Sequence, residues 1–207
     1  YHLELASEST QPESLNSFEL ANRLSYLLWS SQPDQELLDD ANTIQTDSRP
    51  QLTKQVYRMI DDPKIEAWAT EFGGHWLDFR QFQSHNSVDR ERFPQFNSEL
   101  RQAMFEEPIR LLTHFIKYDR PVTELILGDD TFVNLTLSNH YGIELHRTDQ
   151  EWTHIKDVSA LGRGGLLGMA VFQTKNSPGL RTSPVKRGYW VVKQILGERI
   201  PPPPPDV

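Results

Sequence analysis

The chain has 207 residues, a mass of 24.0 kDa and a formal net charge of −8. This length allows one large domain or two small ones. Hydrophobic residues make up 37% and charged residues 24% of the sequence, which is typical of a globular protein with a core and argues against a disordered tail. The absence of cysteine excludes disulfides, thiolate metal sites, cysteine nucleophiles and covalently attached haem within these residues.

Charge is unevenly distributed along the chain. Residues 1–153 carry 13 basic and 26 acidic side chains, whereas residues 154–207 carry 8 basic and 3 acidic ones. This asymmetry predicts either that the two parts pack against each other by charge complementarity or that they meet different partners. With no extended basic and aromatic surface in an acidic chain, nucleic acid is not an expected partner.

The start of the chain and its longest apolar run give no sign of a signal peptide or a membrane span. The start, YHLELASEST, lacks the basic and apolar regions of a signal peptide and has no initiator Met, so we expect the chain to be a piece of a longer polypeptide. The longest clear apolar run, Leu166 to Phe172, is too short to span a bilayer.

The first part of the chain is predicted to be helical. Asn16 and Glu19 have the spacing of a capping box at a helix start. Pro33 and Pro50 fit the first turns of two further helices, and the Asp62–Pro63 pair predicts the start of a fourth. The fourth helix has the best helical period in the chain, with apolar positions at Ile65, Trp68, Ala69, Phe72, Trp76 and Phe79. Its interior glycines, 73 and 74, predict close packing against a neighbour, because glycine otherwise destabilises a helix.

The middle of the chain follows after a connection over residues 81–96. Asn97 predicts the start of a long helix, which Pro108 is expected to kink or divide. A short helix is expected over Asp119 to Leu127, and another between Asn134 and Gly142. The Trp152–Val158 segment favours a short strand or hairpin arm.

The C-terminal part begins with a glycine-rich stretch and returns to a helical pattern from Gly164. Ser183 and Pro184 predict the start of the last helix, and Gly197 its end. The run Pro201–Pro205 predicts an extended polyproline strap of about 15 Å. The predicted fold is therefore mainly α, a multi-helix bundle or two helical layers, with a short irregular or β segment near 143–160.

Three stretches resemble consecutive domains of unknown function from large planctomycete-type cytochrome-c-associated proteins. They are FELANRLSYLLWSSQPDQELL; RFPQFNSELRQAM with DRPVTELILGDDTFVNLTLSNHYGI; and RGGLLGMAVFQTKNSPGLRTSPVKRGYWVVKQILGERIPPPPPDV, similar to the truncated start of a third domain. The resemblance implies domains at 1–80, 81–160 and 161–207, packed together as one unit. Two positions depart from the family pattern: His75 stands where Gln is more usual, and Pro108 lies in a helix that usually lacks proline.

The resemblance implies an exported, periplasmic or cell-envelope location. It also implies c-type haem in the flanking regions of the full-length protein and none within this chain. The flanking haem domains of the same polypeptide would then be its partners. Our preferred interpretation is a haem-free scaffold or interaction module of a redox protein. The alternatives are an envelope enzyme acting on a polymer or sugar derivative, and a structural surface module.

Several polar residues are candidate sites. Glu71, His75 and Asp78 share one helix face and form a metal-site candidate; the alternative is a polar flank beside the apolar stripe. His140, near a predicted helix end, could approach a haem of the full-length protein or simply contact the exposed carbonyls there. No nucleophile, phosphate-binding or dinucleotide motif is present, so no catalytic residue is predicted.

The strongest candidate is an anion-binding turn at the start of the last helix. Its free amides favour an anion, and the cationic side chains nearby would add to this preference. The predicted anion is a haem propionate, a substrate carboxylate or sulfate, or an acidic side chain of a partner or of residues 1–153. The residues of this turn are Arg181, Thr182, Ser183, Lys186 and Arg187.

Overall fold

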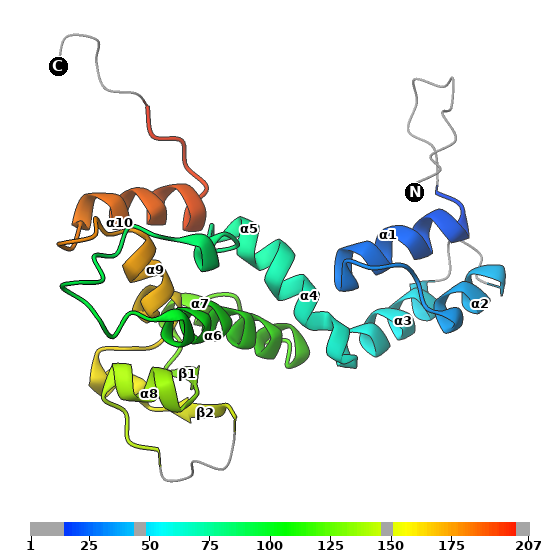
Figure 1. The fold of residues 1–207 in the computed structure, drawn as a ribbon. Helices are drawn as coiled ribbons and strands as arrows, with labels where there is room; N and C mark the ends of the chain where they lie inside the picture. The colour runs from blue at the N-terminus through cyan, green and yellow to red at the C-terminus, as the bar shows by residue number, and fades with distance from the viewer. Residues whose placement is uncertain (1–14, 44–48, 146–150, 202–207) are drawn as a thin grey trace. The chain divides into compact units, whose positions relative to one another are not determined.

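The computed structural model of the protein describes residues 15–43, 49–145 and 151–201 (Figure 1). The chain divides into two compact units, with unit 1 ending at Trp68 and unit 2 beginning at Ala69. The described residues are mainly helical and include one two-stranded antiparallel sheet, so the predicted fold class is confirmed. None of the helices within these residues is long and apolar enough to cross a membrane. Of the predicted polyproline strap, all but Pro201 lies outside the described residues.

Unit 1 contains helices α1 (Ser17–Trp29), α2 (Gln35–Thr43), α3 (Arg49–Asp61), a 3₁₀ turn (Pro63–Ile65) and α4 (Glu66–Trp68). The capping box of α1 is confirmed, since the Glu19 amide donates to the Asn16 side chain and the Asn16 amide to the Glu19 carboxylate, both at 2.9 Å. The core of the unit is centred on Trp29, whose indole N–H donates to the Met59 carbonyl at 2.9 Å.

The start of α2 differs from the predicted one. The helix begins at Gln35 and not at Pro33, because Asp34 is the capping residue: its Oδ1 accepts the Leu37 amide at 3.0 Å. The same carboxylate accepts two hydrogen bonds from Arg58, at 2.6 and 3.0 Å. Arg58 thereby lowers the pKa of Asp34 and ties α3 to the start of α2.

Unit 2 is built around one long helix, α6 (Ser98–Lys117). The elements before it are a π segment (Ala69–Gly73), α5 (Gly74–Trp76) and a 3₁₀ turn (Phe82–Ser84). The elements after it are α7 (Glu124–Leu127), β1 (Asp130–Val133), α8 (Leu135–Tyr141), β2 (Thr153–Lys156), two 3₁₀ turns (Val158–Leu161 and Leu166–Gly168), α9 (Ala170–Lys175), α10 (Pro184–Trp190) and a second π segment (Val191–Ile195).

Helix α6 starts where the sequence predicts but is not divided at Pro108. Asn97 caps it by accepting the Leu100 amide at 2.8 Å. The helix continues through Pro108, with buried residues such as Met104 before the proline and Leu111 after it. A proline removes one helical hydrogen bond, and burial of both halves of α6 offsets that loss.

The best helical period in the sequence does not produce a regular α-helix. The segment runs as a 3₁₀ turn, α4, a π segment and α5. The prediction of one regular helix from Pro63 is therefore wrong. The prediction of close packing at Gly73 is confirmed, because a Cβ atom there would collide with the side chain of Leu112 on α6. A larger residue at this position would have to displace the Leu112 side chain.

An aromatic cluster joins distant parts of the sequence in the core of unit 2. The Phe79 ring makes edge-on contacts with Phe105 and Phe172, each at 5.8 Å between ring centres, and Phe172 stacks on Trp190 at 4.6 Å. The Trp190 indole donates to the Leu77 carbonyl at 2.8 Å. Residues of all three predicted domains therefore meet in one core; the boundaries at 80 and 160 remain predictions.

The sheet combines a predicted strand with an unpredicted partner. Strand β2 lies within the expected segment Trp152–Val158 and pairs antiparallel with β1, with Asp130 opposite Lys156 and Val133 opposite Thr153. Strand β1 immediately precedes α8, which begins at its predicted cap Asn134. The predicted helix before β1 is reduced to α7, a single turn.

Candidate functional site

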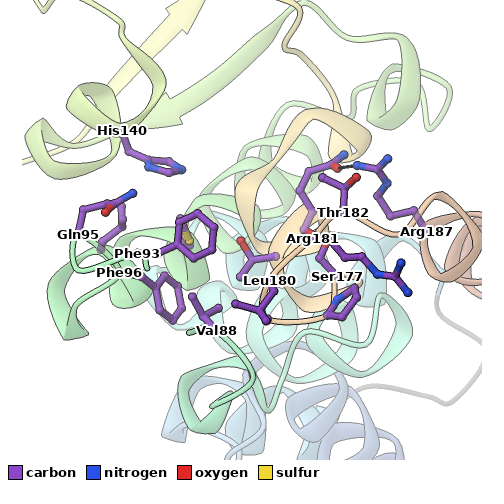
Figure 2. Close-up of a pocket in the computed structure, with 16 residues that line it drawn as sticks. Val88, Phe93, Gln95, Phe96, His140, Ser177, Leu180, Arg181, Thr182 and Arg187 are labelled. Atoms are coloured by element: carbon purple, nitrogen blue, oxygen red, sulfur yellow. Dashed lines mark hydrogen bonds between the residues drawn. The ribbon is translucent and has the colours of Figure 1, made fainter. Parts of the chain in front are cut away.

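Unit 2 contains a largely apolar pocket of about 380 Å³ (Figure 2). Its apolar lining comes from the connection before α6, from α6 itself and from the turn before α10, and comprises Val88, Phe93, Phe96, Leu100, Met104, Pro178 and Leu180. The two connections meet where the Asp89 amide donates to the Gly179 carbonyl at 3.4 Å. Helix α6 thus supplies a rigid wall, and two irregular segments close around it.

One end of the pocket is cationic. Arg181 is exposed, and Arg187 is partly buried and donates to the Gln173 side-chain oxygen at 2.7 Å (Figure 2). Among the described residues, no carboxylate forms an ion pair with Arg181, Lys186 or Arg187. The positive charge of this end is therefore not neutralised by the described part of the chain.

The structure brings part of the predicted anion-binding turn into the pocket. Arg181, Thr182 and Arg187 line it, whereas Ser183 and Lys186 do not. Ser183 caps α10, as predicted, by accepting the Lys186 amide at 3.3 Å. The side chain of Ser183 is thus already used within the turn. Anion binding here stays a prediction.

His140 lines the same pocket from the last turn of α8. Figure 2 shows it beside Gln95, across the apolar side chains from Arg181 and Arg187. Burial, and to a smaller extent the charge of Arg163, lowers the pKa of His140, which favours the uncharged imidazole. Two sites predicted separately from the sequence, the turn and His140, therefore share one pocket.

A family model described as "Protein of unknown function (DUF1592)" matches residues 15–143, more than half of the chain. The chain belongs to this family. A second family model, "Protein of unknown function (DUF1588)", matches residues 163–207. Searches of curated proteins and of solved structures gave no match. The resemblance to domains of unknown function is thus confirmed. In this DUF1592 chain the pocket is lined from both matches, because Val88 to His140 belong to the first and Gln173 to Arg187 to the second.

In the DUF1592 chain, the carboxylates of the predicted metal-site candidate are paired with cationic side chains. Glu71 accepts hydrogen bonds from Arg80 at 2.8 and 3.1 Å, and Arg80 lowers its pKa. Asp78 pairs with Lys175. The side chain of His75 is 71% exposed and lies 3.9 Å from Glu71. Each carboxylate therefore has a cationic partner, and the structure offers no geometric support for a metal site there.

Sequence reasoning missed a polar cluster made by His114, Asp130 and His154, which lines another cavity of unit 2. Burial alone would raise the pKa of Asp130, but hydrogen bonds from Arg120 and His154 bring it below its ordinary value. The three residues come from α6, β1 and β2 and have no common spacing in the sequence. Only the pairing of the strands beside α6 could have indicated them.

Sequence reasoning also missed a buried carboxyl group on α6. Glu107 is 1% exposed and accepts hydrogen bonds from Thr131 at 2.7 Å and from the Tyr141 hydroxyl at 2.6 Å. The Tyr141 oxygen accepts the Ala170 amide at 2.8 Å, so the network joins α6 to β1, α8 and α9. Burial outweighs the hydrogen bonds and raises the pKa of Glu107 to about 7.

Proposed function

We propose that the chain is a haem-free helical interaction module of a larger exported, cytochrome c-associated redox protein. Its pocket would bind a group with an apolar body and an anionic end. One observation carries this proposal: an apolar pocket ends at Arg181 and Arg187, and no described carboxylate neutralises them.

The physical properties of the pocket support this ligand class. A cavity of about 380 Å³ is within the range of small-molecule sites. Its apolar wall would stabilise a bound hydrocarbon or aromatic group by removing it from water. A guanidinium group favours carboxylate or sulfate oxygens, because it presents several N–H donors in a fixed plane. Haem propionates, substrate carboxylates or sulfates and acidic side chains share this chemistry.

The context of the module is also part of the proposal. The chain has no cysteine and cannot attach a c-type haem through thioether bonds. We propose that such haems lie in flanking regions of the full-length protein and that their domains are the partners. A full-length reading frame without C-x-x-C-H motifs on either side would contradict this part of the proposal.

A second candidate function is supported by a separate observation. The cluster of His114, Asp130 and His154 places two imidazoles and a carboxylate at a polar cavity, and such a pairing of acid and base groups favours the alternative of an envelope enzyme. The third alternative, a purely structural surface module, leaves both cavities without a role.

Two fluorescent probes test the pocket. Anilinonaphthalene sulfonate is an aromatic anion, and N-phenylnaphthylamine is its uncharged relative. We expect the anionic probe to bind with one-to-one stoichiometry, and Arg181→Ala to weaken its binding about tenfold through loss of a charge-assisted contact. Binding of the uncharged probe should change little in the same variant.

Lys193→Ala is the matched control, since Lys193 is exposed in the π segment that follows α10 and does not line the pocket. This substitution removes one positive charge and should leave the binding of both probes unchanged. Added salt should weaken the binding of the anionic probe and leave that of the uncharged probe unchanged. If Arg181→Ala and Lys193→Ala bind the anionic probe as tightly as the wild type does, the proposed anion site is wrong.

A further inference from the structure

The strands of unit 2 present two polar side chains on the same sheet face as Phe132, whose ring contacts His114 of α6. Asp130 lies on β1 and His154 on β2, diagonally across the antiparallel ladder, because His154 is directly opposite Phe132. The His154 ring stacks on Phe132 at 4.5 Å between ring centres, and its Nε2 lies 2.7 Å from Asp130 Oδ2. Strand register and ring stacking therefore fix the position of this imidazole.

Helix α6 adds a second imidazole to the pair. The ring centre of His114 lies 4.7 Å from that of His154. Among the described residues, no hydrogen-bond partner is found for either ring nitrogen of His114. One ligand atom each of His114, Asp130 and His154 lies within 4.8 Å of the others. Three potential ligand atoms therefore lie together at one place.

Arg120 holds the carboxylate of this cluster in place. Its guanidinium donates to Asp130 Oδ2 at 2.5 Å and to Oδ1 at 3.1 Å, and it also donates to Glu124 at 2.6 Å. The Asp130 side chain is 7% exposed. Hydrogen bonds to a ligating carboxylate commonly orient it in metal sites. An ion could replace the proton between His154 and Asp130 while Arg120 keeps its contacts.

We propose that His114, Asp130 and His154 form a three-ligand site for a divalent transition-metal ion. Two imidazoles and one carboxylate suit Zn²⁺, Co²⁺ or Fe²⁺, whereas Mg²⁺ and Ca²⁺ require more oxygen ligands. The cluster lines a polar cavity of about 380 Å³, so coordination positions are left for water or a substrate. The site shares none of its ligands with the apolar pocket and is independent of the ligand proposed for that pocket.

Zn²⁺ and Co²⁺ titrations of the whole chain, prepared without a histidine tag, test this site. We expect one equivalent of Zn²⁺ to bind in calorimetry, Co²⁺ to show visible d–d absorption, and excess Mg²⁺ not to compete. His114→Gln and His154→Gln should each weaken Zn²⁺ binding by about tenfold or more, because each removes one of three ligands. His75→Gln, which removes an exposed histidine outside the cluster, is the matched control and should bind as the wild type does.

The histidine ring signals of the wild type give a readout that does not depend on the folding of a variant. In NMR spectra, Zn²⁺ should shift the signals of His114 and His154 and leave those of His75 unchanged. Unchanged His114 and His154 signals at saturating Zn²⁺ would overturn the proposal. Wild-type affinity in both His→Gln cluster variants would also overturn it.

Discussion

The buried Glu107 makes the stability of unit 2 depend on pH in a direction opposite to that of a salt-bridged carboxylate. Its pKa rises from 4.5 to about 7 on folding, because burial disfavours the ionised form. The folded state therefore holds the proton more tightly than the unfolded state does. The resulting stability is fully present below the unfolded pKa of 4.5 and is lost as the pH rises through the folded value near 7.

The size of the effect follows from the shift. One pKa unit corresponds to about 1.4 kcal/mol, so the whole change is about 3 kcal/mol, of which about 2 kcal/mol falls between pH 5 and pH 7. Glu107→Gln removes the titrating group but keeps an amide of similar size. We expect the free energy of unfolding of this variant to depend less on pH, with about 2 kcal/mol less lost over this range than in the wild type.

Urea unfolding followed by circular dichroism at pH 5, 6 and 7 measures the difference. Glu106→Gln is the control, because Glu106 is the preceding residue on α6 and its side chain is 30% exposed. This control should retain the pH dependence of the wild type. If the free energy of unfolding changes with pH equally in the wild type and in Glu107→Gln, the reasoning is refuted. A carboxyl group that is ionised in both the folded and the unfolded state contributes no pH dependence.

Four further substitutions test the packing and capping of unit 2 by thermal or chemical unfolding. Gly165→Ala should destabilise the chain by about 2 kcal/mol or more, because φ is +57° and a Cβ atom would lie 2.7–2.9 Å from the carbonyl groups of residues 125 and 126. Gly162→Ala, at φ +65° with open space around the Cβ position, should cost only about 1 kcal/mol; equal losses would contradict the steric argument. Asn97→Ala should cost about 1 kcal/mol through loss of the α6 cap, and retention of full stability would show that the cap contributes nothing. Phe82→Ala, at a fully buried position, should cost about 3–5 kcal/mol, and a loss below 1 kcal/mol would contradict its place in the core.

Local signals in the sequence were sufficient for the starts of several helices. The caps at Asn16, Asn97, Asn134 and Ser183 were all predicted, and each accepts the amide three residues later. A cap of this kind depends on about four consecutive residues and hardly on the rest of the fold. The absence of cysteine likewise settled, without a structure, that no haem is attached covalently to this chain.

Helix regularity depended on packing as well as on sequence. The apolar period after Pro63 predicts a continuous helix, yet the backbone changes to a π segment over Ala69–Gly73 where Gly73 lies against Leu112. Pro108 was expected to kink or divide α6, and burial on both sides keeps the helix undivided. In each case contacts with distant residues outweigh the local preference.

The candidate sites were decided by tertiary structure. The sequence singled out Arg181, Arg187 and His140 as separate candidates, and the fold placed them around one apolar pocket. No pattern in the sequence indicated that His114 and His154 would meet at Asp130, because strand β1 has no clear period of its own and its partner strand begins more than twenty residues after it begins. Caps and helix starts are encoded within a turn or two of the chain. A cavity or a three-residue cluster requires segments that only become neighbours when the hydrophobic core forms, so no local pattern in the sequence can specify it.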